Sequence, residues 1–338
     1  MIFKTFKTYK WIKRVCILDS SYSLLLYFLI SKQTEIDQTF FFWSDGIPDH
    51  LRKMFMDKSA YIYKNKSLWN YKSKRNVFQK VFYYYVWSFV KFPFLLKRDV
   101  SYWGHDHLPY SRFLVHGNKM RIIEDGTMNY FPRPTRKGNW AERLLFGGPL
   151  LVRKEYCWQQ DYCAAEYLTG IKPDAISMQS SKAIKISITE LWNKSDEQKK
   201  NKICEWFDIS KEEIETLRRF DSILLTSSYS EDGDLTEEEK IDMYKQQLEN
   251  IDISKLVIKP HPREETDYTK FFPGVMVFRK KVPVELMSLL GVTFRKVYTV
   301  TSTAAYEFKN SEIVFWGNEI NAKLYAKNPS RTSVNMSV

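Results

Sequence analysis

The sequence predicts an α/β protein built on parallel sheets, and three observations support this fold class. Short apolar runs alternate with helical, mostly polar stretches along much of the chain, as in strands joined by crossover helices. Glycine, proline or polar residues follow many of these runs directly, as expected where a buried strand ends. A chain of 338 residues is too long for one compact core, which favours two domains.

The first half of the chain begins with an apolar run and a capped helix. The residues after that run, Asp19, Ser20 and Ser21, are good helix caps. Further short apolar runs follow at similar spacing, so the pattern predicts several strands with helices between them. Strands are expected at residues 15–18, 39–43, 60–63, 100–103 and 119–123, and helices at 22–31 and 49–56.

The second half repeats the alternation after a linker at 172–174. Ser210 with Glu213 matches a capping box, and Thr236 is a second candidate cap. Pro283 stands near the first turn of another helix. Strands are expected at 222–226, 255–258, 275–278, 297–300 and 313–316, and helices at 189–203, 210–220, 235–248 and from 282 onward.

Composition and charge limit the function classes. Hydrophobic residues make up 44% of the chain and aromatic residues 16%, which excludes global disorder. The net charge of +12 favours anionic partners: a nucleotide, nucleic acid or an anionic membrane surface. The four cysteines match no zinc motif and are too few for a disulfide framework, so we expect reduced thiols in a cytoplasmic protein.

Two stretches bear on membranes. Residues 77–96 are aromatic and long enough to span a bilayer, but Lys80 and Lys91 interrupt them and Pro93 ends them, which favours a buried or interfacial helix. Residues 1–14 are basic and aromatic and lack a following cleavage site, so they do not read as a signal peptide. They are either a contact with the inner face of the cytoplasmic membrane or a frayed basic end.

The tripeptide Glu124-Asp125-Gly126 follows a predicted strand. Neighbouring carboxylates hinder each other's ionisation, so one pKa should rise, which suits a general base. The alternative is a simple chain reversal at Asp125-Gly126. The same tripeptide at 231–233 lies in a polar run and is predicted to be a solvated loop that leads into a helix.

A single histidine, His261, is held between Pro260 and Pro262 just past a predicted strand. The prolines force the chain to turn there, and the carboxyl edge of an open α/β sheet is where ligands bind. Histidine exchanges protons near neutral pH. A histidine that only hydrogen-bonds its own loop is the alternative.

Small hydroxyl residues at 301–303 follow another strand and open a helix, an arrangement that suits a phosphate group. A plain helix cap is the alternative. The loop 132–148 is rich in Pro, Gly and Arg and is either near an anionic ligand or an ordinary solvated loop. The role of Gly104-His105-Asp106-His107 stays open between acceptor contact and a structural turn.

Together, Glu124-Asp125-Gly126, His261-Pro262 and Ser302-Thr303, each after a strand and in that order, resemble the bacterial sialyltransferases of glycosyltransferase family 52. These are lipooligosaccharide and capsule sialyltransferases, and the bacterial polysialyltransferases share the same short motifs. The stretch 224–232 is similar to the first strand and loop of the family's nucleotide domain. The resemblance spans about 15–317.

The resemblance implies a GT-B fold: two facing Rossmann-like domains with the active site in the cleft between them. The expected domains are 1–170 on the acceptor side and 171–320 for the nucleotide sugar, followed by a tail at 321–338. It implies inverting, metal-independent transfer of sialic acid from CMP-Neu5Ac to a terminal galactoside or sialoside of lipooligosaccharide or capsule, without a cofactor. It also allows a homodimer.

Roles carry over by motif position. Glu124 resembles the general base, with Asp125 beside it and the choice between them open; Gly126 completes that turn. His261 resembles the group that protonates or hydrogen-bonds the departing CMP phosphate. The remaining expected substrate contacts are Ser302 and Thr303 at the phosphate, Glu285 at the ribose and Lys259 near the nucleotide.

Three alternatives stay open. Related folds use other nucleotide sugars, so the donor could differ. A basic nucleic-acid-binding protein fits the charge, although no recognition motif is present and the charge is dispersed. An inactive transferase fold that assists polysaccharide assembly is disfavoured by the intact Glu124, His261 and Ser302.

Overall fold

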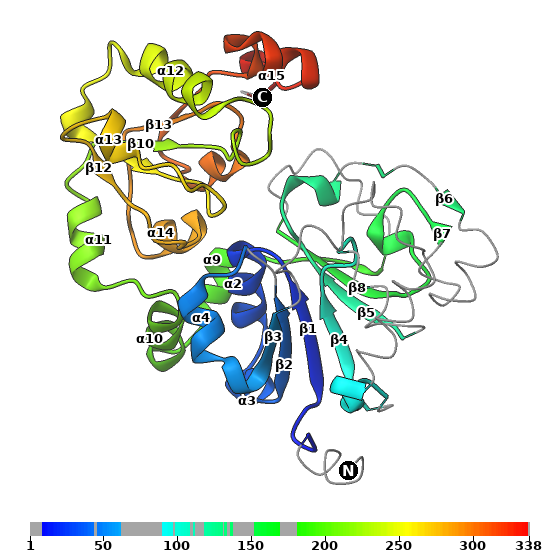
Figure 1. Ribbon diagram of the computed structural model, residues 1–338. Coiled ribbons are helices and arrows are strands. Elements are labelled where there is room, and N and C mark those ends of the chain that lie inside the picture. The colour runs from blue at the N-terminus through cyan, green and yellow to red at the C-terminus, as the bar shows by residue number, and fades with distance from the viewer. Residues whose placement is uncertain are drawn as a thin grey trace. The chain divides into compact units, whose positions relative to one another are not determined.

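The structure is a computed structural model, and it describes residues 9–43, 46–61, 90–96, 99–108, 111, 118–130, 132–133, 136–137, 152–169 and 181–336. The chain divides into two compact units, Met1–Ile203 and Cys204–Val338. Each unit contains its own parallel sheet, as the ribbon in Figure 1 shows. The predicted α/β class with two Rossmann-like domains is therefore confirmed.

The first unit is organised around a seven-stranded sheet in the order β3-β2-β1-β4-β5-β8-β9. All of its strand pairs are parallel. The central strands are continuous apolar runs because both faces of a parallel sheet are covered. The strands are β1 (Arg14–Leu18), β2 (Thr39–Trp43), β3 (Ser59–Tyr61), β4 (Ser101–Gly104), β5 (Met120–Ile123), β8 (Cys163–Leu168) and β9 (Ala183–Lys185).

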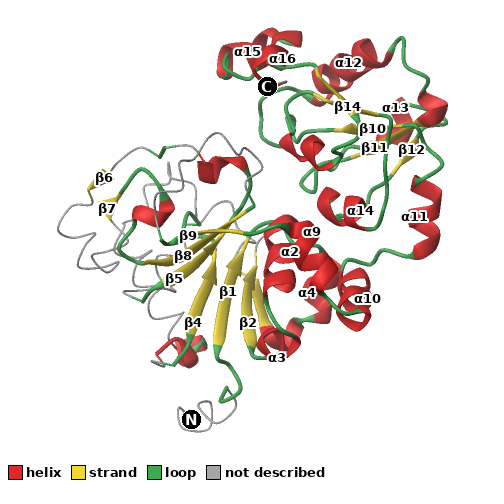
Figure 2. Ribbon diagram, turned by 180° about the vertical axis from the view of Figure 1, so that it is seen from behind, coloured by secondary structure: helices red, strands yellow, loops and turns green. Residues whose placement is uncertain are grey.

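Among the described helices of the first unit, α2 (Ser21–Ile30) is well covered, with eight of its ten residues buried. Ser20 caps it by accepting a hydrogen bond from the backbone of Ser23, as the sequence predicts. Figure 2 shows α2 grouped with its neighbours at one side of the first sheet. These are α3 (Gln33–Asp37), α4 (Asp49–Met54) and α9 (Ile188–Lys194), and the short antiparallel pair β6 (Arg136–Lys137) and β7 (Val152–Arg153) lies elsewhere in the unit.

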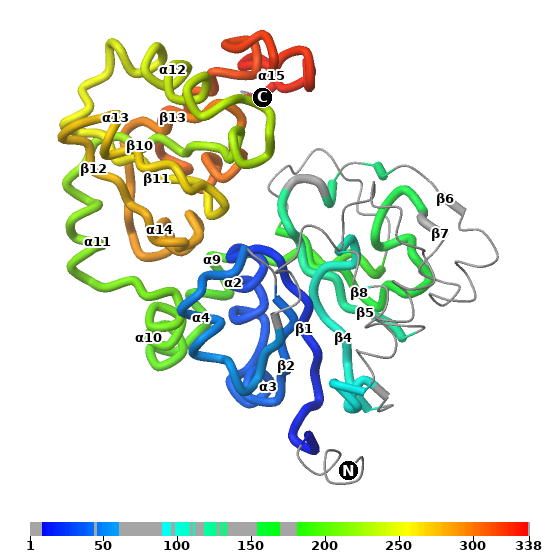
Figure 3. The backbone as a smooth tube through the Cα atoms, viewed as in Figure 1, coloured from blue at the N-terminus to red at the C-terminus, as the bar shows by residue number. Residues whose placement is uncertain are grey.

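The second unit has a five-stranded parallel sheet in the order β12-β11-β10-β13-β14. Its strands are β10 (Ser222–Leu225), β11 (Leu256–Lys259), β12 (Met276–Val277), β13 (Lys296–Thr299) and β14 (Glu312–Phe315). Figure 3 follows the alternation of these strands with helices along the chain. The helices are α11 (Lys211–Leu217), α12 (Glu237–Leu248), α13 (Tyr268–Phe271), α14 (Val284–Leu289), α15 (Ala322–Lys327) and α16 (Ser333–Met336). Capping boxes at Ser210 and Thr236 begin α11 and α12, as expected.

Several details differ from the sequence prediction. The expected helix at 189–203 is two helices, α9 and α10 (Glu197–Trp206), because the first ends at Ser195 and Asp196 accepts the backbone N–H of Lys199 to open the second. The unit boundary falls at 203/204 rather than 170/171, since β9 pairs with β8 and stays in the first sheet. The segment named a tail packs on the second unit, where Leu324 joins the core.

Two findings bear on the predictions about membranes and thiols. In the described parts of the chain, every helix is too short or too polar to cross a membrane; most of the 77–96 prediction lies outside those parts. The four cysteines form no disulfide with one another; Cys16, Cys157 and Cys163 are buried, whereas Cys204 is partly exposed.

Candidate functional site

The first candidate site lies at the carboxyl edge of the first sheet. β5 ends at Ile123, and Glu124 and Asp125 follow directly. Gly126 turns the chain there with φ 116°, a conformation that favours glycine. β4 is the parallel neighbour of β5 and ends at the same edge. His105 and His107 therefore come close to the carboxylates, and we call Glu124, Asp125, His105 and His107 the carboxylate cluster.

Glu124 is fully buried, and both of its carboxylate oxygens accept hydrogen bonds. The hydroxyl of Tyr22 donates to Oε1 at 2.9 Å, and that of Tyr130 donates to Oε2 at 2.6 Å. Thr169 adds its backbone N–H and its hydroxyl. Burial raises the pKa of Glu124, and these donors oppose the rise. Glu124 is thus a buried anchor that ties α2, the turn after β5 and the end of β8 together.

Asp125 is the more accessible acid, with 26% of its side chain exposed. Nε2 of His107 lies 3.3 Å from its Oδ2, and Nε2 of His105 lies 3.4 Å from its Oδ1. Asn129 holds the backbone by accepting the Asp125 N–H at 3.1 Å. Burial raises the pKa of Asp125, and the imidazole of His107 opposes the rise. The raised pKa expected for one of the two acids therefore falls on both, but only Asp125 is open to solvent.

The two histidines differ in their surroundings. His105 is buried, and burial lowers its pKa to about 3. Its Nε2 lies 2.8 Å from the hydroxyl of Ser23, which itself donates to the Glu124 carbonyl at 2.7 Å. Nε2 of His105 must then be the donor, and its buried Nδ1 has no hydrogen-bond partner among the described residues. His107 is 39% exposed, and burial followed by the charge of His105 lowers its pKa to about 4.

Asp106, between these histidines, points into a different contact. It accepts two hydrogen bonds of 3.0 Å from Arg133 and one of 2.8 Å from the hydroxyl of Tyr162. Arg133 belongs to the loop 132–148 for which an anionic ligand or a solvated surface was expected; most of that loop, including Arg143, lies outside the described residues. The one arginine of that loop whose side chain is described is paired inside the protein.

The second candidate site is the His261 loop, residues 260–266, which follows β11 at the carboxyl edge of the second sheet. The backbone N–H of Arg263 donates to Nδ1 of His261 at 3.3 Å. Burial, followed by the charge of Arg263, lowers the pKa of His261 to about 4. The imidazole is therefore neutral at pH 7 and carries its proton on Nε2. It is only partly buried, so this N–H can meet a ligand.

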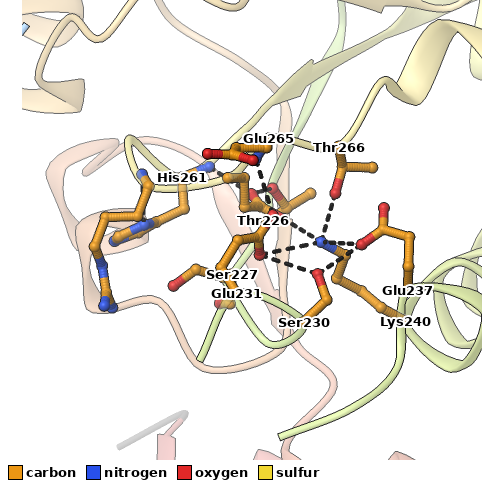
Figure 4. Close-up of polar contacts among 12 residues, drawn as sticks. Thr226, Ser227, Ser230, Glu231, Glu237, Lys240, His261, Glu265 and Thr266 are labelled. Atoms are coloured by element: carbon orange, nitrogen blue, oxygen red, sulfur yellow. Dashed lines mark hydrogen bonds and ion pairs between the residues drawn. The ribbon is translucent and has the colours of Figure 1, made fainter. Parts of the chain in front are cut away.

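A buried lysine, Lys240 of α12, contacts this loop, as the dashed lines in Figure 4 show. Its ammonium group lies 3.2 to 3.4 Å from three carboxylates, those of Glu231, Glu237 and Glu264, and donates to Thr266 at 2.5 Å. Glu264 accepts the backbone N–H of His261 at 2.6 Å. The second Glu-Asp-Gly copy is solvated at Asp232 and Gly233 as expected, but its Glu231 takes part in this network.

The remaining predicted ligand residues are near the second sheet edge. Lys259 is buried at the end of β11 and donates to the Lys280 carbonyl at 2.9 Å. Burial lowers its pKa to about 8, and the nearby Glu285, itself buried, opposes that change. Ser302 and Thr303 follow β13, but they open a short 3-10 helix (Thr303–Glu307) and not the expected α-helix. Within the described residues neither hydroxyl makes a hydrogen bond.

The structure thus brings Glu124 and Asp125 together in one unit and His261, Lys259 and Glu285 in the other. Sequence reasoning left His105 and His107 open and did not pair them with Asp125. The signal existed, because both motifs follow predicted strands, but the adjacency of β4 and β5 is set by tertiary pairing. The role of Lys240 could not be predicted from the sequence, because a lysine in a charged helix is normally expected to be exposed to solvent.

The fold and the family match define a glycosyltransferase of the GT-B class. The chain matches glycosyltransferase family 52 over residues 50–324 and belongs to that family. An uncharacterized protein of Haemophilus influenzae is 38% identical over 243 residues, which cover 69% of this chain and 75% of that protein. The predicted family and enzyme class are confirmed.

Solved sialyltransferases share the fold. The α/β-galactoside α-2,3-sialyltransferase of Photobacterium phosphoreum matches 89% of this chain and 88% of its own, with a TM-score of 0.55 and 12% identity. A 2,6-sialyltransferase of Photobacterium sp. JT-ISH-224, solved with CMP and lactose, matches 89% of this chain and 71% of its own, with a TM-score of 0.57 and 12% identity.

Proposed function

We propose that this protein is an inverting, metal-independent sialyltransferase. It moves sialic acid from CMP-Neu5Ac to a terminal galactoside or sialoside of a bacterial lipooligosaccharide or capsular polysaccharide. Membership of family 52 and the fold shared with sialyltransferases support the donor, and the neighbour solved with CMP and lactose supports the acceptor class. The observation that carries the proposal is the pair of sheet-edge groups: a solvent-accessible acid with a raised pKa, Asp125, and a neutral histidine, His261.

Asp125 is the base that we favour. It removes the proton of the acceptor hydroxyl, whose oxygen then bonds to the anomeric carbon of sialic acid. Glu124 is less suited to act as the base, because four donors occupy its oxygens and none of its side chain is exposed. A fully buried carboxylate would have to break those bonds before it could reach a sugar.

His261 acts at the leaving group. The bond between the anomeric carbon and the phosphate oxygen breaks, and the electron pair leaves with CMP. The Nε2–H of His261 donates a hydrogen bond to that oxygen as its negative charge develops. Ser302 and Thr303, whose hydroxyls have no partner in the described part of the chain, are the groups we assign to the same phosphate; Lys259 and Glu285 stay predicted nucleotide contacts.

Metal independence rests on the state of the acidic loop. The single Asp-x-Asp, Asp232-Gly-Asp234, has both carboxylates in ion pairs, with Arg263 at 2.7 Å and with Lys327. We expect EDTA to leave transfer intact. Loss of transfer in EDTA that a divalent ion restores would contradict this.

Contact with the anionic inner membrane would fall to the basic N-terminal segment. Two of its residues are already engaged, since Lys13 pairs with Asp99 at 2.5 Å and Arg14 pairs with Glu35. Co-sedimentation with anionic vesicles, lost when residues 2–14 are deleted, is the expected result. Binding that survives the deletion would contradict it.

A homodimer stays a prediction, which sedimentation velocity can check.

The test of the function is CMP release from CMP-Neu5Ac with lactose as acceptor. We expect Asp125→Asn and His261→Ala to lower acceptor-dependent release about 100-fold or more. Asp161→Asn is the matched control, because this exposed acid of the same unit pairs with Lys154 on the surface. If Glu124→Gln loses as much activity as Asp125→Asn while its fold persists, the base is Glu124. If CMP-Neu5Ac is not turned over at all, the donor is another nucleotide sugar.

A further inference from the structure

The carboxylate cluster has a second chemical property that sugar transfer does not use. One ring nitrogen of His105, one ring nitrogen of His107 and one carboxylate oxygen of Asp125 lie within 4.8 Å of one another. They are the one such group of three or more His, Cys, Asp or Glu residues in the part of the chain that the structure describes. We propose that these three side chains bind a divalent ion of the zinc class, and that the bound ion blocks the base of the transfer reaction.

The donor set fits zinc. Zinc takes nitrogen and oxygen ligands at about 2.0–2.1 Å in a tetrahedron, which sets ligand atoms about 3.3 Å apart. Each imidazole already lies at this spacing from one Asp125 oxygen, His105 Nε2 at 3.4 Å from Oδ1 and His107 Nε2 at 3.3 Å from Oδ2. Three protein ligands leave a fourth position for water, the arrangement of open zinc sites. Harder ions such as Mg²⁺ and Ca²⁺ prefer all-oxygen sites and are disfavoured here.

The backbone fixes two of the ligands. His105 follows Gly104, whose φ of 107° and packing against the Ile17 carbonyl leave no room for a side chain. Asp125 stands between β5 and the left-handed Gly126. Because the carboxyl ends of β4 and β5 are adjacent, these ligands approach each other before any ion arrives.

The third ligand, His107, is open to solvent and can change its orientation when an ion binds. His107 and Asp125 are 39% and 26% exposed, so an ion can enter from solvent. The two imidazole rings stack with centroids 5.1 Å apart and planes 22° apart. An ion lies in the plane of each ring that binds it, so His107 must rotate on binding, which its exposure permits.

His105 can coordinate an ion through Nε2 if its ring proton moves to Nδ1. Its Nε2 donates to Ser23 in the metal-free protein, whereas its buried Nδ1 has no partner among the described residues. On metal binding the proton moves from Nε2 to Nδ1 and Nε2 presents its lone pair. This exchange gives up the hydrogen bond from Nε2 to Ser23 and loses none at Nδ1.

The blocking effect rests on the proposed function, while the binding does not. An Asp125 oxygen that coordinates zinc no longer takes a proton from the acceptor. The ion would thus inhibit a reaction that itself needs no metal.

The binding test uses metal-free, tag-free protein of full length. Zn²⁺ is titrated against a chromogenic chelator, and Co²⁺ replaces it for a visible absorption spectrum. The Cys204→Ser background removes the one partly exposed thiol, which could bind zinc by itself. We expect one ion per chain and a tetrahedral cobalt spectrum. His107→Ala should weaken binding about tenfold or more, whereas His50→Ala, a histidine outside the cluster, should leave it unchanged.

His107 is partly exposed, so its loss should leave the fold intact; His107→Gln and a melting curve check this. Zinc should lower CMP release, and EDTA should restore it. No stoichiometric binding, or binding that His107→Ala does not weaken, would overturn the site, and transfer that requires zinc would overturn the inhibitory role. Binding without any sialyl transfer would support the site and refute the proposed function.

Discussion

Oε2 of Glu264 accepts the backbone N–H of His261 at a distance of 2.6 Å. The same carboxylate accepts the hydroxyls of Thr226 and, at 2.7 Å, of Tyr268. One buried side chain therefore joins the end of β10, the His261 loop and α13. The orientation of the imidazole depends on this contact as well as on the flanking prolines.

Glu264→Gln should slow catalysis by misplacing His261. The amide offers one oxygen where the carboxylate offered two, so the two donors on the replaced oxygen, such as Thr226 and the His261 N–H on Oε2, lose their acceptor. We expect kcat to fall about tenfold, the effect of losing one hydrogen bond to a charged group, about 1.5 kcal/mol, with KM nearly unchanged. Steady-state CMP release measures both constants. Glu265→Gln is the control because that side chain is exposed; an equal loss there would argue against the positioning role.

Lys240→Met should destabilise the second unit. The ammonium group is fully buried among three carboxylates, and its removal leaves their charges unopposed. Breaking a buried pair of this kind costs about 3–5 kcal/mol. Urea denaturation would detect this as a lower midpoint. Lys245→Met, on the exposed face of the same helix, should cost less than about 1 kcal/mol, and similar values for both would contradict the prediction.

Glu166 should make stability fall as the pH rises from about 4.5 to about 7. Burial raises its pKa to about 7, so the folded state keeps a proton that the unfolded state has already released at about pH 4.5. The contribution is greatest below pH 4.5 and is lost through pH 7, about 3 kcal/mol in all. Glu166→Gln should reduce this slope in urea titrations at pH 5 to 8, and the other buried acids with raised pKa values, such as Glu124, keep the remainder. Glu155→Gln, on an exposed side chain, should keep it.

The two turn glycines of the first site should differ in their tolerance of alanine. A Cβ at Gly104 would lie 2.0 Å from the Ile17 carbonyl oxygen, whereas one at Gly126 meets no atom within 4 Å. Both have positive φ, so Gly126→Ala should cost only the conformational strain, about 1–2 kcal/mol. Gly104→Ala should cost clearly more because β1 and β4 must separate. Equal melting temperatures for the two variants would contradict this.

Most strands were predictable because they are buried on both faces. Runs such as Val15–Leu18 and Leu256–Ile258 are continuously apolar, and this pattern needs no tertiary information. β9 was missed because it is a short edge strand with exposed positions. β8 was hard to recognise because it contains Glu166, a buried acid in an otherwise apolar strand.

The candidate site was predictable at its strand ends and not in its partners. Turn residues after apolar runs indicate where Asp125 and His261 fall. Two of the hydroxyls on Glu124 come from Tyr22 and Thr169, which are 102 and 45 residues away and meet it only when the sheet forms. Burial likewise separates Glu124 from its neighbour Asp125, and no local pattern encodes that difference.

The burial of three of the four cysteines makes the fourth, Cys204, a position for selective chemical labelling. Burial raises the pKa values of Cys16, Cys157 and Cys163, the last to about 12, so these sulfurs stay protonated and inert towards alkylating reagents. Cys204 lies on α10, within the helix at which the two units divide. A maleimide fluorophore would therefore attach at one position of the unaltered sequence, on helix α10.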